Sequence, residues 1–233
     1  MIVRSATILG LLVAALAWRG GAAVVLDRSG PDADCALSMI EARCSFENAP
    51  VRIAPEGRMI AGKPHPYHPI LAPLSFRDGQ GTLWTAPRAA LTDGASIPPA
   101  LVGMIGEPTS PEFLAAAALH DVYCGVGNEH LPQFHSRGWE ETHRMFHDAL
   151  LAAGVSRTKA RVMFAAVYLA GPRWNDPGRS LDGVPEEVLR REMERCLRFI
   201  EENDSTRDEI EDWMRGREAG LLGGTALAAS APL

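Results

Sequence analysis

One stretch in the middle of the chain, Pro111 to Tyr123, constrains the fold more than any other. It reads Pro-Glu-Phe-Leu-Ala-Ala-Ala-Ala-Leu-His-Asp-Val-Tyr and follows Thr109-Ser110, a composition typical of a capped helix start. Helical periodicity puts His120 on one stripe with Phe113 and two of the alanines, and Asp121 on the neighbouring stripe. The alanines let another element approach closely. We therefore expect an imidazole and a carboxylate at the edge of a tightly packed core, where each needs a partner.

Length and composition favour one compact domain. A chain of 233 residues with 46% hydrophobic content can bury a sizeable core. Its net charge of -6 and pI near 5.7 argue against a nucleic-acid binder, which needs a basic face. We expect an α+β fold: a small antiparallel sheet followed by a mainly helical core of three to five helices, stapled by disulfides. Residues 51–218 form this domain, between an irregular lead-in (24–50) and a disordered tail (219–233).

The first residues predict an export signal. Arg4 precedes an apolar run from Ala6 to Trp18, and small residues follow at Gly20 to Ala23. Cleavage after Ala23 is favoured over cleavage after Ala17, because the earlier cut would shorten the apolar core. The run is short for a transmembrane helix, although an uncleaved anchor remains an alternative. A signal peptide over residues 1–23 implies a periplasmic or secreted protein that associates with the cell envelope.

Four cysteines allow three pairings in an oxidising compartment. We favour Cys35 with Cys44, a short local loop, and Cys124 with Cys196, which would join the end of the His-Asp helix to a late helix. Cys196 shares an apolar helical stripe with Leu189, Met193 and Ile200, so its sulfur should face inward. Alternatively, the thiols are reduced and buried.

Short strands and turns are expected from residue 51 to residue 93, where brief apolar runs alternate with Pro and Gly clusters. His65 and His68 lie in a proline-rich part of this region, and exposed turn positions are favoured over metal ligands. The turn from Thr92 to Pro99 follows. Its Asp93 and Ser96 either fix the turn through their own backbone or face the helical site.

Four further helices are predicted after the His-Asp helix, over residues 138–153, 157–170 with Ser156 as cap, 185–203, and from 205 or 206 to about 216. In the first of these, His143 falls on the core-facing stripe, and His147 lies one turn later. His130 and His135, in the preceding loop, are expected on the solvent side.

His120 and Asp121 point about 100 degrees apart on a helix, so they do not pair with each other, but both can face a cleft that His143 closes. In one arrangement Asp121 binds a hard cation such as calcium and His120 activates a water molecule. In another, His120, Asp121 and His143 bind a transition metal such as zinc. The structural alternative has His120 bonded to a core carbonyl, Asp121 paired with an arginine such as Arg144, and Tyr123 packed. Ser96 lacks the flanking glycines of a nucleophile elbow.

Four segments together resemble the domain of unknown function 1353 family (DUF1353), bacterial and bacteriophage proteins with no assigned activity. The segments are Thr92-Asp93-Gly94-Ala95-Ser96-Ile97-Pro98, His120-Asp121-Val122-Tyr123, Trp139 to Phe146, and Val162 to Gly171. The resemblance covers about Leu74 to Pro172. The family usually has an aspartate where this chain has His143, so an acceptor-only carboxylate is replaced by an imidazole.

His120, Asp121 and Tyr123 also resemble the His-Asp-x-x-Tyr helix of secreted calcium-dependent phospholipases. In those enzymes the histidine activates water, the helix aspartate binds calcium, and an aspartate on a second helix orients the histidine. His143 departs from that pattern, and the glycine-rich calcium loop is missing from the sequence before the helix.

We therefore expect an exported, metal-assisted hydrolase that acts on a small-molecule or lipid-like ester. Its site comprises Asp93, His120, Asp121, Tyr123 and His143, and a divalent cation, calcium or zinc, is held by Asp121, His120 and His143. The competing hypothesis is a non-enzymatic envelope or phage-derived assembly protein, in which the same polar cluster fixes the junction between sheet and helices.

Overall fold

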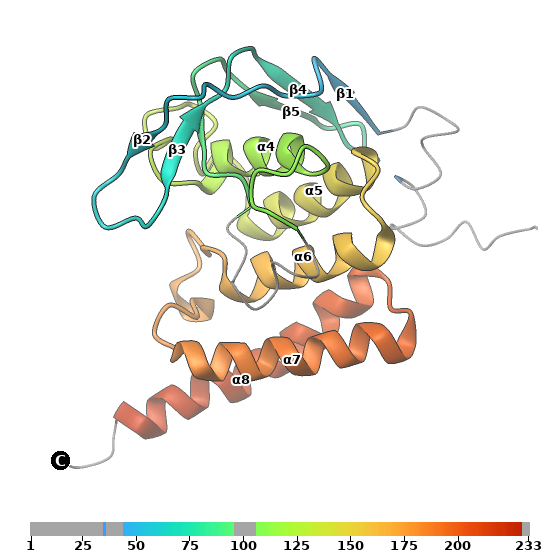
Figure 1. Ribbon diagram of the computed structural model, residues 1–233. Coiled ribbons are helices and arrows are strands. Elements are labelled where there is room, and N and C mark those ends of the chain that lie inside the picture. Colours follow the sequence, from blue (N-terminus) through green and yellow to red (C-terminus); the bar gives the residue numbers. More distant parts are fainter. Residues whose placement is uncertain (1–34, 36–43, 96–105, 230–233) are drawn as a thin grey trace, which may run out of the picture.

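The chain stacks a layer of short strands on successive layers of helices (Figure 1). The structure, a computed structural model, describes Cys35 and residues 44–95 and 106–229, with side chains as far as residue 223. The strands lie on one side of helix α4, and α5, α6 and the pair α7 and α8 follow in turn below it. The α+β architecture expected from the sequence is confirmed, with its helical core after the strands in chain order.

Two small antiparallel sheets are present where the sequence predicts one. The first has the order β1-β4-β5, with bounds Ser45–Glu47, Leu74–Arg77 and Leu83–Ala86. Side chains along β4 and β5 alternate between buried and more exposed positions. The buried ones, including Phe76 and Trp84, belong to the main core. The second has the order β2-β3-β6, with bounds Arg58–Met59, Pro66–Pro69 and Leu91–Thr92.

The proline-rich segment expected to be an exposed turn forms strand β3. Its prolines stand at the two ends of the strand, Pro66 and Pro69, and Tyr67 between them is buried. His68 is half-buried and its Nδ1 lies 2.8 Å from the carbonyl of Ala54, whereas His65 is exposed. His65 and His68 therefore do not face a shared position at which both could bind one metal ion.

Among the residues that the structure describes, five α-helices follow the strands: α4 (Leu114–Cys124), α5 (Trp139–Ala152), α6 (Arg157–Ala170), α7 (Glu186–Asn203) and α8 (Arg207–Ala229). A short 3-10 turn, η1, covers Pro177–Arg179. Helix α4 begins later than expected, because residues 111–113 form turns and Phe113 takes the N-cap position without a side-chain hydrogen bond. Ser156 caps α6 as predicted and accepts a hydrogen bond from Lys159 N.

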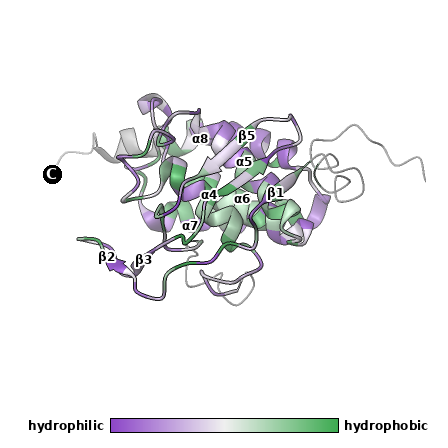
Figure 2. Cartoon of the chain, turned by 90° about the horizontal axis from the view of Figure 1, so that it is seen from above, coloured by the Kyte–Doolittle hydropathy of each residue, from purple (hydrophilic) through white to green (hydrophobic). Residues whose placement is uncertain are grey.

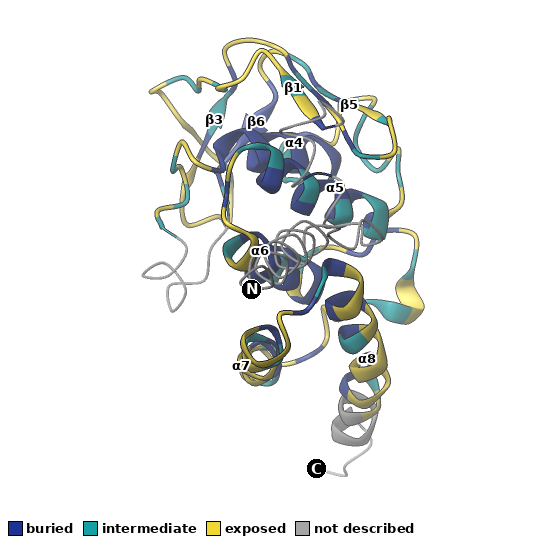
Figure 3. Cartoon of the chain, turned by 90° about the vertical axis from the view of Figure 1, so that its right-hand side faces the viewer, coloured by how far each residue is buried: buried dark blue, intermediate teal, exposed yellow. Residues whose placement is uncertain are grey.

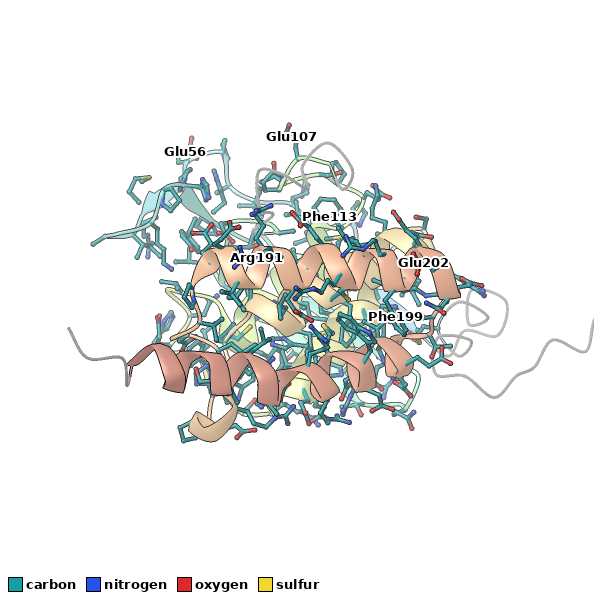
Figure 4. The ribbon with its side chains drawn as sticks, turned by 90° about the horizontal axis from the view of Figure 1, so that it is seen from below. Glu56, Glu107, Phe113, Arg191, Phe199 and Glu202 are labelled. Atoms are coloured by element: carbon teal, nitrogen blue, oxygen red, sulfur yellow. A yellow bond between two sulfur atoms is a disulfide. The ribbon has the colours of Figure 1, made fainter. Side chains whose placement is uncertain are left out.

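Helix α8 continues beyond its predicted end near residue 216 and through most of the tail expected to be disordered. Its apolar residues Ile210 and Met214 are buried before the predicted end, and Leu221 continues this buried stripe one turn or more beyond it. Figure 4 shows α7 and α8 side by side, with Phe199 pointing between them, where it stacks on Trp213. The outer surface of α7 is exposed and charged (Figure 3).

Of the two favoured disulfides, one is present. Cys35 and Cys44 are bonded, as predicted. Cys124 and Cys196 are free thiols, so the second bridge was wrong and the reduced alternative holds for them. The reason is the layering, because α6 lies between α4, which carries Cys124, and α7, which carries Cys196 (Figure 1).

The predicted signal peptide lies outside the described residues. Over the part of the chain that the structure describes, no helix combines the length and apolar character that a bilayer-spanning segment requires.

Candidate active site

A cavity of about 440 Å³ opens where α4, α5 and α6 meet the turn after β6. Its apolar wall includes Ala117, Phe146, Met163, Ala166, Val167 and Ala170. Its polar wall includes Tyr67, Asp93, His120, Asp121 and Cys124. In Figure 2 the helices beneath the strands carry the hydrophobic residues, whereas β2 and β3 at the edge are more hydrophilic. Three of the five predicted site residues, Asp93, His120 and Asp121, therefore border one cavity.

The two histidines predicted to converge are in direct contact. His120 Nε2 on α4 lies 3.0 Å from His143 Nδ1 on α5, within hydrogen-bond distance. His120 lines the cavity and keeps 8% of its surface exposed, while His143 stands behind it and is fully buried. The Phe146 ring packs on His120 at a centroid distance of 4.9 Å. The imidazole at the cavity wall is thus held by a second imidazole and an aromatic ring.

Burial keeps both imidazoles neutral. It lowers the pKa of His120 from 6.5 to about 4. The pKa of His143 is also well below its usual value, because of burial first and then the charges of His120 and Arg173. His143 Nε2 has no hydrogen-bond partner of standard geometry among the described residues, although the backbone of Pro172 is close enough to favour a proton on the ring. A side chain at position 171 would crowd the imidazole of His143, since a Cβ on Gly171 would lie 3.1 Å from His143 Nε2.

Asp121 holds the turn after β6 against α4. Its Oδ2 accepts a hydrogen bond of 2.6 Å from Thr92 Oγ1, and Thr92 Oγ1 in turn accepts one from Gly94 N. Gly94 has a φ of +81°, and a Cβ there would lie 2.2 Å from the Pro108 carbonyl oxygen, so the turn requires glycine. Arg144, the partner suggested for Asp121, pairs with Glu211 instead.

The charge of Asp93 acts on Asp121 across the cavity wall. The pKa of Asp121 is raised well above its usual value, because of burial first and the charge of Asp93 second. Tyr67 is hydrogen-bonded to Asp93, and burial followed by the charges of both aspartates raises the pKa of Tyr67 to about 12. This part of the wall is therefore acidic and contains an aromatic hydroxyl.

Tyr123 faces the sheet and not the cavity. Its hydroxyl accepts a hydrogen bond of 3.2 Å from Thr85 N, and its ring packs edge-on against Trp84 at 4.9 Å. Of the predicted site residues, Tyr123 is the one that the structure places apart from the others. Ser96 lies outside the described residues.

Two residues near the site were missed by reasoning from the sequence. Asn128 is fully buried and bonds the backbone of Leu91 in both directions, and its Nδ2 also donates to the Asp121 carbonyl. A single asparagine in a loop gives no signal of this kind. Cys124 lines the cavity with its Sγ 3.5 Å and 3.6 Å from the two ring nitrogens of His120, a position obscured by its assignment to a disulfide. Burial, followed by the charge of Asp121, raises the pKa of its thiol.

The expected metal ligands point to different partners. His120 meets His143, whereas Asp121 is turned toward Thr92. Within the described ranges, no three or more His, Cys, Asp or Glu side chains are grouped so that they could hold a metal ion. The loop histidines stand apart, as His130 is exposed and His135, expected on the solvent side, is half-buried and stacks on Trp174.

Residues 68–167 match the family described as "Protein of unknown function (DUF1353)". This segment, less than half of the chain, is similar to that family. The DUF1353 segment runs from the second half of β3 to the last turn of α6, so it contains β4, β5 and β6, the His120 and His143 pair, and most of the cavity wall. The resemblance seen in the four sequence segments is thereby confirmed.

Two relatives of this chain come from Sinorhizobium fredii (strain NBRC 101917 / NGR234). The uncharacterized protein y4iH is 42% identical over 108 residues, which are 46% of this chain and 42% of the relative. The uncharacterized protein y4jT is 35% identical over 120 residues, 52% of this chain and 33% of the relative. The matched part thus spans less than half the length of either relative. No solved structure matches the chain.

Proposed function

We propose that this chain hydrolyses an ester bound in the cavity, with His120 as the general base. The observation that carries the proposal is the neutral imidazole of His120 at the cavity wall, held from behind by His143 at 3.0 Å. A general base must be unprotonated at the working pH and fixed by a second group, and His120 meets both requirements. A pocket with an apolar wall and a few convergent polar groups is the usual form of a small-molecule site.

In the proposed reaction, His120 Nε2–H donates to His143 Nδ1, and a water molecule displaces the Cys124 thiol, whose Sγ lies 3.6 Å from His120 Nδ1, to reach the lone pair of that nitrogen. Water gives its proton to this nitrogen while its oxygen attacks the ester carbonyl carbon. The tetrahedral intermediate then expels the alcohol oxygen, which takes the proton back from His120. His143 acts as a positioning residue, because it selects the tautomer of His120.

The apolar wall supports a lipid-like substrate. Met163, Ala166 and Val167 of α6 face Ala117 and Phe146 across the cavity, so an acyl chain would replace water against apolar surface. A cavity of about 440 Å³ suits a short acyl chain. The described side chains do not fit a three-ligand metal site, so the mechanism contains no metal step, and the metal assistance expected from the sequence stays a prediction.

The test is hydrolysis of a chromogenic nitrophenyl ester of a short fatty acid by the purified chain. We expect His120→Asn and His143→Asn to lower kcat/KM by at least about 100-fold, the usual contribution of a positioned base. His147→Asn is the matched control, because His147 is also fully buried on α5 but does not line the cavity. Activity that survives His120→Asn would rule out the proposed base.

The assay is repeated after treatment with a chelator and after addition of calcium or zinc. Activity that persists in chelator supports the metal-free mechanism. Activity that requires an added cation would restore the metal assignment to Asp121, His120 and His143.

A second candidate, a non-enzymatic envelope or phage-derived assembly protein, is favoured by one observation. Thr92, Tyr123 and Asn128 use their polar atoms to join strands to α4, as expected if the cluster is structural. This candidate predicts no ester turnover, wild-type stability unaffected by chelator, and severe unfolding of both His120→Ala and Asp121→Ala.

Export to the periplasm or beyond completes the proposal. It is supported by the apolar run from Ala6 to Trp18 and by the Cys35–Cys44 disulfide, a bond that persists in oxidising compartments. Mass spectrometry of the mature protein tests it, with an N-terminus at residue 24 as the expected result.

A further inference from the structure

We infer that the cavity binds its ester with the acyl chain inward and the alcohol part toward solvent, so that it accepts long alcohols but not long acyl chains. Met163 and Ala166 on α6 are the specificity-determining residues. The inference deepens the proposed function, on which it rests for the ester bond itself. Its basis is the way in which the exposure of the lining residues changes along α4 and α6.

One face of α6 follows the cavity from a buried end to an open end. Met163, Ala166, Val167 and Ala170 line the cavity at helical spacing. Met163 keeps 3% of its surface exposed, Ala166 and Val167 are half-buried, and Ala170 is exposed. The helix rises by about 10 Å between the first and the last of these residues. Along α6, the cavity is therefore deepest at Met163 and opens at Ala170.

Helix α4 shows the same change in exposure. Ala117, His120, Asp121 and Cys124 line the cavity at helical spacing. Ala117 keeps 2% of its surface exposed, His120 keeps 8%, and Cys124 is half-buried. His120 thus stands about one turn closer to the open end than Ala117. The wall on its inner side, at Ala117 and Met163, is apolar.

The end of α6 places the imidazole pair at the same level. His143, which bonds His120, lies against Gly171, the residue that follows α6, because a Cβ there would lie 3.1 Å from His143 Nε2. Gly171 also lines the cavity, next to the exposed Ala170. An ester carbonyl beside His120 therefore has the open end on one side and the apolar, buried end on the other.

The polar groups on the strand side lie beside the carbonyl position. Thr92 Oγ1 donates to Asp121 Oδ2 at 2.6 Å, and Tyr67 is hydrogen-bonded to Asp93, the neighbour of Thr92. These groups therefore face the turn of α4 that carries His120 and Asp121. They suit the polar ester group, whereas the inner part of the cavity suits a hydrocarbon chain.

The open end accepts the other part of the ester. Lys63 and Asp182 line the cavity there, and both are exposed. The alcohol part of a lipid-like ester is its larger and more polar part, and at this end it keeps its contact with water. The acyl part is hydrocarbon and gains most from leaving water. The acyl chain therefore points inward, and its length is limited by the buried end.

Binding is tested first, without any reaction. Titration calorimetry measures the affinity of linear alcohols from butanol to decanol. Affinity should rise about fourfold with each added methylene and then level off, once the chain has filled the buried end. A rise that continues through decanol would mean that the cavity sets no limit on chain length, and would overturn the inference.

Variants then locate the limit. Met163→Ala should move the levelling-off point to a longer alcohol, and Ala166→Leu should move it to a shorter one. Met145→Ala and Ala152→Leu are the matched controls, because Met145 is as buried as Met163, Ala152 is half-buried like Ala166, and neither lines this cavity. The controls should leave the point unchanged. If Met163→Ala fails to fold, the half-buried position 166 still decides, and an unmoved point in folded Ala166→Leu overturns the assignment.

Turnover separates this inference from the proposed function. Decyl acetate and ethyl decanoate are isomers that carry the long chain on opposite sides of the ester, and acid release from each is compared with its alkaline hydrolysis. Relative to that reference, decyl acetate should have a kcat/KM at least about tenfold higher. Equal rates, or a preference for ethyl decanoate, leave the hydrolysis intact and overturn the orientation. If neither ester is hydrolysed while alcohol binding levels off as expected, the proposed hydrolysis fails and the chain-binding end of the cavity stands.

Discussion

The two sides of helix α4 use buried polar groups in opposite ways. On the side of the strands, Tyr123 and Asn128 bond to backbone atoms of β5 and β6. On the side of α5, His120 bonds to another side chain, His143, and borders a cavity with Cys124. Polar groups with backbone partners fix the geometry of the fold. Polar groups that meet each other beside a cavity remain available for chemistry, and this contrast locates the candidate site.

The titratable side chains also differ between the strand region and the cavity. Asp78, at the end of β4, accepts hydrogen bonds from Gln80 N, Thr82 N and Trp84 Nε1, so its carboxylate is fully used by the strand region. Around the cavity, burial instead lowers the pKa of His120 and raises that of Asp121. Titratable groups driven toward their neutral forms in a cavity are typical of functional sites.

The largest effect on stability is expected on the strand side. Asn128→Ala removes three hydrogen bonds, two of them buried, and leaves backbone groups of Leu91 unpaired, so the free energy of unfolding should fall by about 3 kcal/mol. Denaturant unfolding measures this loss. The control is Gln80→Ala, an exposed amide, with an expected change below about 0.5 kcal/mol. A similar loss for both variants would contradict the structural role of Asn128.

A pair of substitutions contrasts the two sides directly. Tyr123→Phe removes the acceptor of the Thr85 N–H bond and should cost about 1 kcal/mol of stability. His143→Leu should cost about 1 to 2 kcal/mol, because it leaves His120 Nε2 unpaired. Ester turnover should separate them, with little change for Tyr123→Phe and a loss of at least about 100-fold for His143→Leu. If turnover falls equally in both, the two sides of α4 do not differ in function.

The pH dependence of stability should report the neutral histidine pair. Between pH 6.5 and about 4 the unfolded chain protonates His120 and the folded chain does not. The unfolded state binds more protons in this window, so stability falls as the pH falls, by up to about 1.4 kcal/mol per pH unit for this group. Thermal melts across the window should show a shallower decline for His120→Asn. An unchanged slope would mean that His120 is protonated normally in the folded state.

The smallest effect concerns the two free thiols. Cys124 borders the cavity and Cys196 is fully buried, so iodoacetamide should label Cys124 in the folded protein and Cys196 only after denaturation. Labelling of Cys124 should be slow at neutral pH, because burial raises the pKa of its thiol. Peptide mass spectrometry identifies the labelled residue, with Cys124→Ser as the control. If Cys196 were labelled before Cys124, then Cys196 and not Cys124 would be the accessible thiol.

Much of the helical core could be predicted from the sequence, because its signals are local. Ser156 and Gly171 bound α6 where expected, and the apolar stripe of α5 puts His143 toward the core. The contact between His120 and His143 follows from two such stripes on neighbouring helices. The end of α8 was missed, because the burial of Leu221, beyond the predicted end, results from tertiary packing and is not signalled by the Gly- and Ala-rich local composition.

The amino-acid sequence by itself determined the α+β class, the approximate positions of the helices and the imidazoles on core-facing stripes, since periodicity and spacing are properties of neighbouring residues. Only the tertiary structure decided that Asp121 turns to Thr92, that Tyr123 faces the strands, and that Cys124 opens onto the cavity. Adjacent residues on a helix point in different directions, and which neighbour each one meets depends on how distant segments pack.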